Sequence, residues 1–597
     1  MDRDMPFSMG QFIWTGYDYI GEPTPYHTKN SYFGLIDTAG FYKDAYYAWK
    51  SAWVSAKKDP FVHVFPYWDF NEGEEVDVRV VSNAPFVELF VNGKSLGKQE
   101  LTHERGSGDH IFADYKCIYE KGEIKAIAYD ALGKEIAEQV RRSFEDTDSF
   151  EVIYENVDNL VFAKISALDK KGNPVENACD RVKVTVTGGR LIGLDNGDST
   201  DYDSYKADER ALFSGKLLAI VEKDGSAGDI VVDVLKVSDI VPVRKVELVT
   251  DSETKLSMQN SRAKVTAKVL PENATNKEVF YRILDNKGNE SNIAKLLVKG
   301  NEAEVEALFD GEFILRCETK DKDGVVKTIS TRKFTVSGMG RSFLNPYSLI
   351  PGNVFSYSKG RTAAGNEHGV ATDRGNETLI AYDGIDFGIE GSDTITIPIF
   401  ALSGDAYKIQ IWDGIAGDEG ALLLDEVIYQ KKSIWNTYQE ETWKLSKRLC
   451  GVHTISFVTY DKMHIKGFYF ERQLRALCES SALDADSIYG DSFTRSEGAV
   501  EGIGNNVTLG FDNMNFGDEG VKEIIITGRA MAASNTIHLR MKNESGETKE
   551  ILEFPKSSEY TKVCFPIEHK KGRYDISFVF LPGSNFDFKS FRFSEKN

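Results

Sequence analysis

An internal repeat in the last part of the chain limits the possible folds more than any other feature. Tyr382–Gly388 aligns with Phe511–Gly517 at an offset of 129 residues, and Gly451–Val458 aligns with Gly572–Val579. Both copies are rich in short segments that alternate apolar and polar residues, which is the pattern of strands with one buried face. Two such copies in succession predict two jelly rolls. The expected domains are residues 338–476 and 477–597.

More strand-rich sequence lies before the repeat. Val76–Val81 and Val87–Val91 alternate at period two, and Asn92-Gly93 follows directly as the strongest short signal for a β-hairpin. These segments predict a small antiparallel sandwich over residues 58–147.

Two further β domains are expected between this sandwich and the repeat. Phe162–Leu168 has the pattern of a strand, and Ala263–Leu270 alternates without interruption. We therefore expect a second sandwich at residues 148–238 and a third at residues 239–337.

The opening of the chain has a different pattern. Phe12–Trp14 is an apolar run that predicts a short buried strand, and Gly16, Gly21 and Pro23 then interrupt regular structure. Tyr42–Lys57 places its alanines and tryptophans on one face of a predicted helix. Strand, polar and aromatic loop, and helix make one β/α unit, with the loop at the strand end where such folds bind ligands.

This opening resembles the signature of family 2 glycoside hydrolases, especially β-galactosidases. Gln11–Pro23 matches that signature almost residue for residue, and Ser31–Asp37 continues the match. In that family the segment is the last strand, loop and helix of the catalytic barrel, followed by immunoglobulin-like domains and often by sugar-binding jelly rolls. The resemblance implies hydrolysis of terminal β-galactosides with retention of configuration, through a covalent glycosyl intermediate.

The expected fold class is mainly β. It comprises a remnant of a (β/α)8 barrel at residues 1–57, three immunoglobulin-like β-sandwiches and two jelly-roll, carbohydrate-binding-like domains. A complete barrel needs about 250 residues, and only 57 precede the all-β pattern. We therefore expect the carboxyl-terminal portion of a larger enzyme, with the missing barrel portion as a possible partner.

The resemblance also implies that this chain holds no catalytic residue. The family's acid/base and nucleophile are glutamates that lie before the matching stretch. Asp18 and Glu22 are an alternative pair of carboxylates, but they come from one loop beside Gly21 and Pro23. We expect them to position the loop by hydrogen bonding.

Trp14 is the main substrate-binding candidate. The resemblance implies that it forms the floor beneath the sugar at the scissile bond, and an indole suits this task because it is rigid and amphipathic. Packing in a barrel core is the alternative. Tyr17 and Asp18 are candidates for the rim of the same site.

The same stretch carries information on the substrate. Uronidase relatives place an Asn-x-Lys signature where this chain has Ser31–Phe33, so the cation that would pair with a uronate carboxylate is missing there. The resemblance therefore implies a neutral hexose, hence a galactoside, although Lys29 lies close.

The first jelly roll is the better candidate for carbohydrate binding, because the second has no tryptophan. In the predicted strand Tyr407–Trp412, Trp412 points away from the alternate apolar residues. We therefore expect Trp435 and Trp443 to be the exposed pair, and Trp435, Tyr438 and Trp443 are the candidate carbohydrate-binding residues. The alternative is that these rings fill sandwich cores or interdomain seams.

The remaining features exclude several classes of function. A net charge of −21 disfavours nucleic acid and anionic membranes as partners, and no apolar run is long enough to span a membrane. We find no phosphate loop and no His/Cys metal constellation, and we expect no cofactor and no metal. The acidic cluster Asp195, Asp198, Asp201 and Asp203 suggests calcium, but its spacing fits turns better.

Two functions remain. The chain belongs to a β-galactosidase, or it is a non-catalytic carbohydrate-binding and spacer protein. Trp68, in the first sandwich, either reaches the active-site rim or packs between domains.

Overall fold

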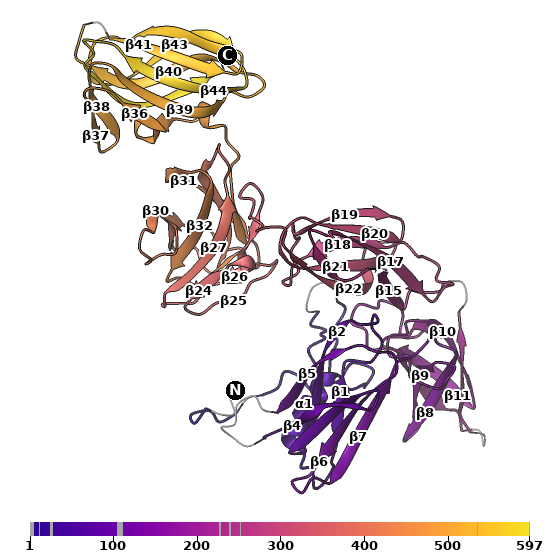
Figure 1. The fold of residues 1–597 in the computed structure, drawn as a ribbon. Helices are drawn as coiled ribbons and strands as arrows, with labels where there is room; N and C mark the ends of the chain where they lie inside the picture. Colours follow the sequence, from indigo (N-terminus) through magenta and orange to yellow (C-terminus); the bar gives the residue numbers. More distant parts are fainter. Residues whose placement is uncertain are drawn as a thin grey trace. The chain divides into compact units, whose positions relative to one another are not determined.

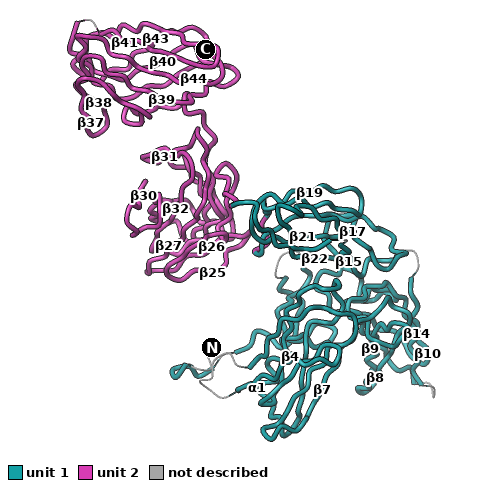
Figure 2. Tube along the Cα trace, in the orientation of Figure 1, with its two compact units in different colours: residues 1–286, 290–340 teal, residues 287–289, 341–597 magenta. Residues whose placement is uncertain are grey.

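The computed structural model of the protein describes residues 5–10, 12–23, 28–103, 111–225, 229–237, 240–250, 252–533 and 535–595. The chain divides into two compact units, residues 1–286 with 290–340, and residues 287–289 with 341–597 (Figure 2). Strands are the main regular structure of both units (Figure 1), so the predicted mainly β fold is confirmed. Five large hydrophobic clusters of buried residues lie along the chain, within residues 62–128, 144–232, 246–336, 350–470 and 476–593.

The opening of the chain contains a helix but differs from the predicted β/α unit. Helix α1 (Asp44–Trp53) lies within the predicted span Tyr42–Lys57. The predicted buried strand at Phe12–Trp14 was wrong, since these residues form no strand, and Phe12 and Trp14 are exposed. A strand is stable only when neighbouring strands share its backbone hydrogen bonds. Among the described residues this opening pairs through isolated bridges, which include Tyr17 with Ile36, Ile20 with Asn30 and Ile36 with Tyr42.

Two sheets, in the orders β1-β2-β5 and β4-β3-β6-β7, follow the helix. The turn from β3 to β4 is the two-residue hairpin that the sequence predicts, and both Asn92 (φ 48°) and Gly93 (φ 79°) have positive φ. The strands are β1 (Val62–Phe65), β2 (Glu75–Ser82), β3 (Phe86–Val91), β4 (Lys94–Glu100), β5 (Phe112–Ile118), β6 (Glu123–Tyr129) and β7 (Glu135–Arg142).

Trp68 lies in the core between these two sheets. Its side chain is fully buried, and its indole N–H donates to the carbonyl oxygen of Glu120 at 3.2 Å. Tyr119 and Phe70 pack against the ring, with centroids 5.1 and 6.2 Å away. The residue therefore fills this core, and it serves neither of the two roles expected from the sequence.

The next two pairs of sheets complete the first unit. Their orders are β12-β10-β14 with β11-β13-β9-β8, and β15-β17-β20-β19 with β16-β22-β21-β18. The first pair is formed by β8 (Ser149–Val157), β9 (Leu160–Leu168), β10 (Arg181–Thr187), β11 (Gly189–Asp195), β12 (Glu209–Ala211), β13 (Lys216–Lys223) and β14 (Val231–Lys236). The second pair is formed by β15 (Lys245–Thr250), β16 (Lys255–Ser257), β17 (Arg262–Leu270), β18 (Phe280–Leu284), β19 (Ala294–Lys299), β20 (Glu302–Ala307), β21 (Gly311–Lys320) and β22 (Val326–Ser337).

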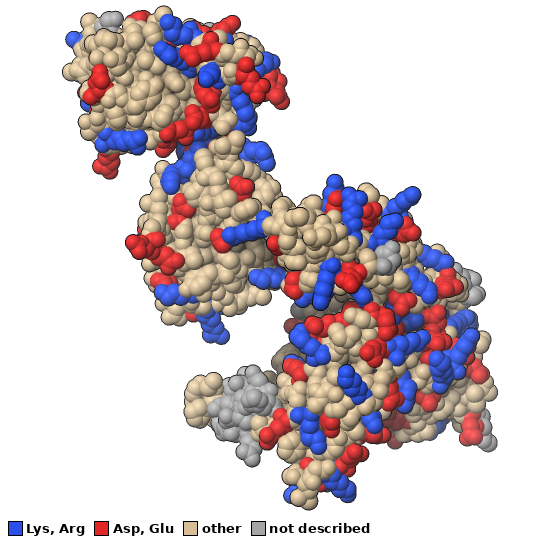
Figure 3. Space-filling model, viewed as in Figure 1, with Lys and Arg blue, Asp and Glu red and all other residues tan. Residues whose placement is uncertain are grey.

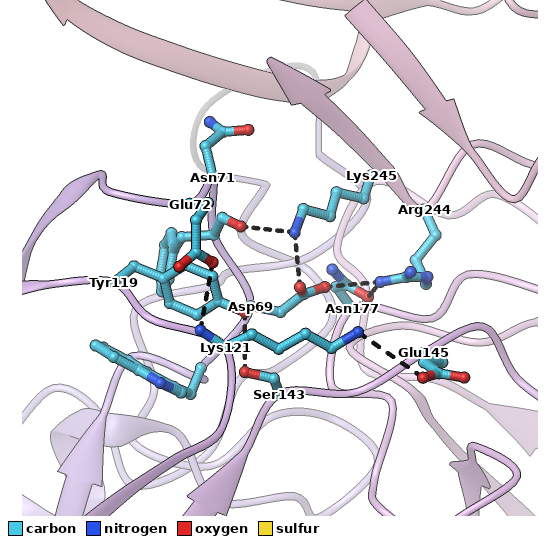
Figure 4. A network of polar contacts seen from close by, with 12 residues as sticks. Asp69, Asn71, Glu72, Tyr119, Lys121, Ser143, Glu145, Asn177, Arg244 and Lys245 are labelled. Carbon is cyan, nitrogen blue, oxygen red and sulfur yellow. Dashed lines mark hydrogen bonds and ion pairs between the residues drawn. The ribbon is translucent and has the colours of Figure 1, made fainter. Parts of the chain in front are cut away.

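One buried loop connects all three sandwiches of this unit (Figure 4). Asp69 accepts from Arg244 at 2.9 Å and from Lys245 at 2.6 Å, and its side chain is only 7% exposed. Arg244 also contacts Asn177 at 3.2 Å and Asp146 at 2.9 Å. The loop of the first sandwich thus holds a cation pair from the third, and one of these cations also reaches the second.

Asn71, two residues further along the same loop, adds neutral hydrogen bonds. Its Oδ1 accepts from the backbone N–H of Leu248 at 2.7 Å, and its Nδ2 donates to Ser330 Oγ at 2.9 Å and to the Thr331 carbonyl at 3.2 Å. The side chain is 2% exposed, so these groups have no competing water. Elsewhere on the first unit, acidic and basic side chains are intermixed over the face seen in Figure 3.

The second unit contains the repeat as two pairs of sheets. In the first copy, a seven-stranded sheet (β23-β34-β28-β33-β26-β25, with β31 on β28) faces the sheet β24-β27-β32-β29-β30. In the second, β37-β38-β45-β40-β43, with β35 on β45, faces β36-β39-β44-β41-β42. The aligned repeat segments occupy equivalent strands, β27 with β39 and β32 with β44.

The strands of the first copy are β23 (Ile350–Pro351), β24 (Tyr357–Lys359), β25 (Ala363–Ala364), β26 (Val370–Ala371), β27 (Thr378–Asp386), β28 (Ser392–Ala401), β29 (Tyr407–Asp413), β30 (Leu422–Tyr429), β31 (Gln439–Leu449), β32 (Val452–Thr459), β33 (Met463–Ile465) and β34 (Gly467–Phe470). Those of the second are β35 (Ser480–Ser481), β36 (Ser487–Tyr489), β37 (Thr494–Ser496), β38 (Ala499–Ile503), β39 (Val507–Asn515), β40 (Val521–Ala530), β41 (Thr536–Asn543), β42 (Gly546–Glu553), β43 (Ser557–Lys570), β44 (Arg573–Phe580) and β45 (Phe586–Ser594).

Candidate functional site

Two parts of the opening segment lie against each other and form the candidate site. The N–H of Leu35 donates to the Thr15 carbonyl at 3.2 Å, and the N–H of Ile36 to the Gly16 carbonyl at 3.0 Å. The approach is closest at Gly34, where an added Cβ would lie 2.3 Å from the backbone nitrogen of Asp18. Only glycine fits there, which explains its place in the motif.

Asp18 anchors this arrangement. Its Oδ1 accepts from the N–H of Gly34 and its Oδ2 from Lys43 Nζ, both at 2.7 Å. The Asp18 side chain is 1% exposed, whereas Lys43 is 31% exposed and also donates to the Tyr32 carbonyl at 2.8 Å. A carboxylate that is buried and doubly bound in this way is suited to holding a loop.

Trp14 lies at the start of a short chain of hydrogen bonds. Its indole N–H donates to Tyr19 Oη at 3.0 Å, and the Tyr19 hydroxyl donates to the Glu22 carboxylate. This second bond raises the pKa of the Tyr19 phenol, which therefore stays a neutral donor. The ring of Trp14 is 74% exposed although its nitrogen is held, so one face of the indole is available.

The three predicted substrate-binding residues therefore have different surroundings. Trp14 and Tyr17 are exposed, and Asp18, which bonds to Gly34 and Lys43, is buried. Sequence reasoning missed Tyr19 and Lys43, which hold Trp14 and Asp18. The motif gave a signal for Tyr19 because it lies within the matched stretch, whereas Lys43 lies 25 residues from Asp18 and outside it.

The opening segment also contacts the second sandwich. The N–H of Lys29 donates to the Ser199 carbonyl at 2.8 Å, and its ammonium lies 4.6 Å from the ring centroid of Tyr205. Asp37 lies against Gly197, where an added Cβ would be 2.3 Å from Asp37 Oδ2. The turn at residues 195–203 is thus the surface on which the opening rests.

The aspartates of this turn each have a partner among the described residues. Asp195, Asp198 and Asp201 each accept from a backbone N–H two residues ahead, which is the geometry of Asx turns. Asp201 also accepts from Arg210 at 2.9 Å, and Asp203 pairs with Arg181 at 2.6 Å. Turn formation therefore accounts for this cluster.

Asp37 makes this contact sensitive to pH. Burial, aided by the charge of Asp195, raises the pKa of the Asp37 carboxyl from 3.8 to about 6. The folded state thus holds a proton that the unfolded chain releases near pH 4. The stability from this proton is fully present below pH 4 and is lost as the pH rises through 6. We expect a loss on the order of 2 kcal/mol over that interval.

Asp37→Asn tests this expectation, because the amide keeps the shape and cannot ionise. Thermal unfolding from pH 4 to 8 should show a smaller fall in the melting temperature of the first unit for the variant than for the parent chain. Parallel pH profiles for the two proteins would contradict it. Asp198→Asn, in the same turn but bound to Thr200, is the matched control.

In the first jelly roll the structure separates the three candidate aromatic residues. Trp435 is 76% exposed and Tyr438 is half-buried beside it, and both rings contact Phe400. Trp443 packs against the core on the other face of the sheet. Trp435 and Tyr438 therefore belong together, and Trp443 is not part of the exposed pair expected from the sequence.

Comparison with known proteins agrees with the sequence motif. Residues 148–237 match the family described as glycoside hydrolase family 2 C-terminal domain 5, and residues 73–137 match a domain of unknown function, DUF4982. The chain is 37% identical over 236 residues to β-galactosidase BoGH2A of Bacteroides ovatus. The aligned region covers 38% of this chain and 27% of that protein. It is 32% identical over 101 residues to a β-glucuronidase of Formosa agariphila. This aligned region covers 17% of this chain and 10% of that protein.

A solved structure is also similar. The crystal structure of a β-glycosidase from Bacteroides vulgatus shares 30% sequence identity over 39% of this chain and 30% of its own, with a TM-score of 0.36. The chain spans about a quarter of the length of the B. ovatus relative. Residues 148–237 therefore match a C-terminal domain of glycoside hydrolase family 2, and the similar proteins include a β-galactosidase and a β-glucuronidase.

Proposed function

We propose that this chain is the carboxyl-terminal part of a retaining glycoside hydrolase that acts on terminal β-galactosides. The observation that carries the proposal is the placement of Trp14, a largely exposed indole whose nitrogen is held by Tyr19. Such a ring offers a fixed apolar face to the C–H side of a sugar. Tyr17, three residues further along the chain, is also exposed.

The acid and the nucleophile of the reaction come from residues other than Asp18 and Glu22. Asp18 is buried and bound to Lys43, and the carboxylate of Glu22 accepts from Tyr19. A retaining enzyme needs two carboxyl groups about 5 Å apart that are free to meet the substrate. Both of these carboxylates hold the loop, which supports the proposal that the chain alone is catalytically incomplete.

Galactoside is favoured over glucuronide by the position of Lys29. This is the cation closest in sequence to the place where uronidase relatives carry theirs, and its ammonium lies against Tyr205, buried away from solvent. It is therefore not available for a uronate carboxylate. The name of the B. ovatus relative, a β-galactosidase, points in the same direction.

The test has two arms. The purified chain should release no more p-nitrophenol than a buffer blank from p-nitrophenyl β-galactoside or β-glucuronide, and turnover at enzyme-like rates would refute the proposed incompleteness. A chimera that joins this chain to the preceding portion of the B. ovatus relative should cleave the galactoside and leave the glucuronide. A preference for the glucuronide would overturn the assignment of substrate.

In that chimera, Trp14→Ala should lower kcat/KM on the galactoside by roughly 100-fold, because the sugar loses the surface that orients it. Trp14→Phe should retain part of the activity. Trp53→Ala, an exposed tryptophan on α1, is the control and should leave kcat/KM within about twofold of the parent value.

The second candidate function is non-catalytic carbohydrate binding. The exposed Trp435 in the first jelly roll favours it, and it is compatible with the first proposal.

A further inference from the structure

An aromatic cluster lies on the outer face of the seven-stranded sheet in the first jelly roll. Ile395, Ile397 and Ile399 of β28 point into the core, so Phe400 must point to the opposite face. Phe400 is nevertheless only 4% exposed. The rings of Trp435, Tyr438 and His464 cover it, with centroids 5.6, 6.5 and 5.2 Å away. We call these four residues the aromatic cluster.

The loop that carries Trp435 is fixed in place. The N–H of Thr437 donates to the Ile434 carbonyl at 3.2 Å, and Asn436 has a positive φ of 54°, so Trp435 occupies the second position of a tight turn. The side chain of Asn436 accepts from the side chain of Asn366, on a neighbouring loop.

Tyr438 makes a second connection between the two loops, because its hydroxyl donates to the Asn366 carbonyl at 2.8 Å. Gly369 allows this approach, since an added Cβ there would lie 2.7 Å from Tyr438 Oη. The aromatic cluster is therefore preorganised, which lowers the entropic cost of binding a ligand.

A polar pair borders the aromatic cluster beside Tyr438. Lys466 pairs with Glu367 at 2.5 Å, and its ammonium lies 5.9 Å from the ring centroid of Tyr438. These two side chains are 30% and 58% exposed, so both can exchange water for other hydrogen-bonding groups. A cluster that combines an exposed indole with a donor and an acceptor beside its tyrosine matches a ligand with one apolar face and several hydroxyls.

The second jelly roll supplies an internal comparison at the same position. Phe400 pairs with His464 in the first copy, and Arg529 pairs with Asp587 in the second. Each pair is flanked by a tyrosine with a lysine over its ring. The equivalent pairs are Tyr438 with Lys466 at 5.9 Å and Tyr560 with Lys589 at 5.6 Å.

The second copy fills this position with its own ion pairs. Arg529 contacts Asp587 at 2.6 Å and Glu501 at 3.6 Å, and Tyr560 donates to Glu501 at 2.9 Å. The guanidinium also lies over the Tyr560 ring, 5.0 Å from its centroid. Arg529, Asp587 and Glu501 are thus already paired with charges of opposite sign, so a sugar would have to break these contacts to bind.

We propose that the aromatic cluster of the first jelly roll binds a neutral pyranose, and that the equivalent position in the second jelly roll does not. The apolar face of the sugar stacks on Trp435, and Lys466 and Glu367 bind its hydroxyls. The inference rests on the proposed function for its ligand class and extends it by naming the site. Trp443, on the other face, takes no part.

Isothermal titration calorimetry of the full chain tests this, with methyl β-D-galactopyranoside, lactose and methyl β-D-glucopyranoside as probes and methyl β-D-glucuronide as the charged comparison. At least one neutral probe should bind. Trp435→Ala should weaken it at least about tenfold, whereas Trp435→Phe should have a smaller effect. Tyr438→Ala should also weaken binding, and Tyr560→Ala, the matched change in the second copy, should leave it unchanged.

Three results would overturn the proposal. They are the absence of binding to every neutral probe, unchanged binding by Trp435→Ala, and a loss of binding on Tyr560→Ala or Arg529→Ala. Thermal unfolding of each variant shows whether a loss of binding reflects a loss of fold. If the alanine variant unfolds, Trp435→Phe still tests the site, because it keeps a ring over Phe400. Because hydrolysis is measured separately on the chimera, failure of one proposal leaves the other standing.

Discussion

Asp69→Ala is expected to lower the free energy of unfolding of the first unit by about 3–5 kcal/mol, the usual cost of removing one partner from a buried ion pair. The change leaves Arg244 and Lys245 buried, with side chains 7% and 11% exposed, and without the carboxylate between them. Arg244 keeps Asp146 and Asn177, which places the effect toward the lower end of the range.

Hydrogen–deuterium exchange of the full chain would locate this loss. Peptides that contain Arg244 or Asn177 should exchange faster in the variant, and peptides from β28 in the other unit should not. Asp69→Asn keeps two hydrogen-bonding groups and should show an intermediate effect. Unchanged protection around Arg244 would mean that the third sandwich does not depend on this loop.

Trp68→Ala is the second large effect, with an expected loss of about 3–5 kcal/mol, because it empties a large space in a packed core. The indole is fully buried and packs on Tyr119 and Phe70. Its N–H bond to the Glu120 carbonyl is lost as well, which leaves a buried acceptor unpaired.

Denaturant unfolding measures this loss of stability. Hydrogen–deuterium exchange of peptides from β2 and β5 then shows whether it arises in this core. Trp68→Phe retains most of the volume and should cost roughly half as much. Trp53→Ala, at the exposed end of α1, should be within about 0.5 kcal/mol of the parent chain. A loss for Trp68→Ala no greater than that of the control would contradict the core position of Trp68.

The sequence predicted those features that depend on local periodicity. The mainly β fold, the hairpin at Asn92-Gly93 and the repeat all rest on alternation, which the chain shows clearly. The same rule placed Trp412 on the face opposite Tyr407, Ile409 and Ile411, and the structure has these three in the core and Trp412 outside it.

The rule could also have separated Tyr438 from Trp443. These residues are an odd number of positions apart on one extended segment, so their side chains point to opposite faces. The expectation of Trp435 and Trp443 as an exposed pair relied on the polarity of the surrounding residues, which does not distinguish the two faces.

Other features could not be predicted, because they depend on contacts between distant residues. Nothing near Asp69 indicates Arg244 or Lys245, and nothing near Asp18 indicates Lys43. The buried strand expected at Phe12–Trp14 failed for a related reason, since an apolar run becomes a strand only where other strands pair with it.

The buried loop at Asp69 and Asn71 has a consequence for how this chain can change during evolution. A recombination event that exchanged only the third sandwich would have to bring its own arginine, lysine and serine to the same three positions, or leave the loop with an unpaired carboxylate and amide. We therefore expect the first three sandwiches to be inherited together as one block.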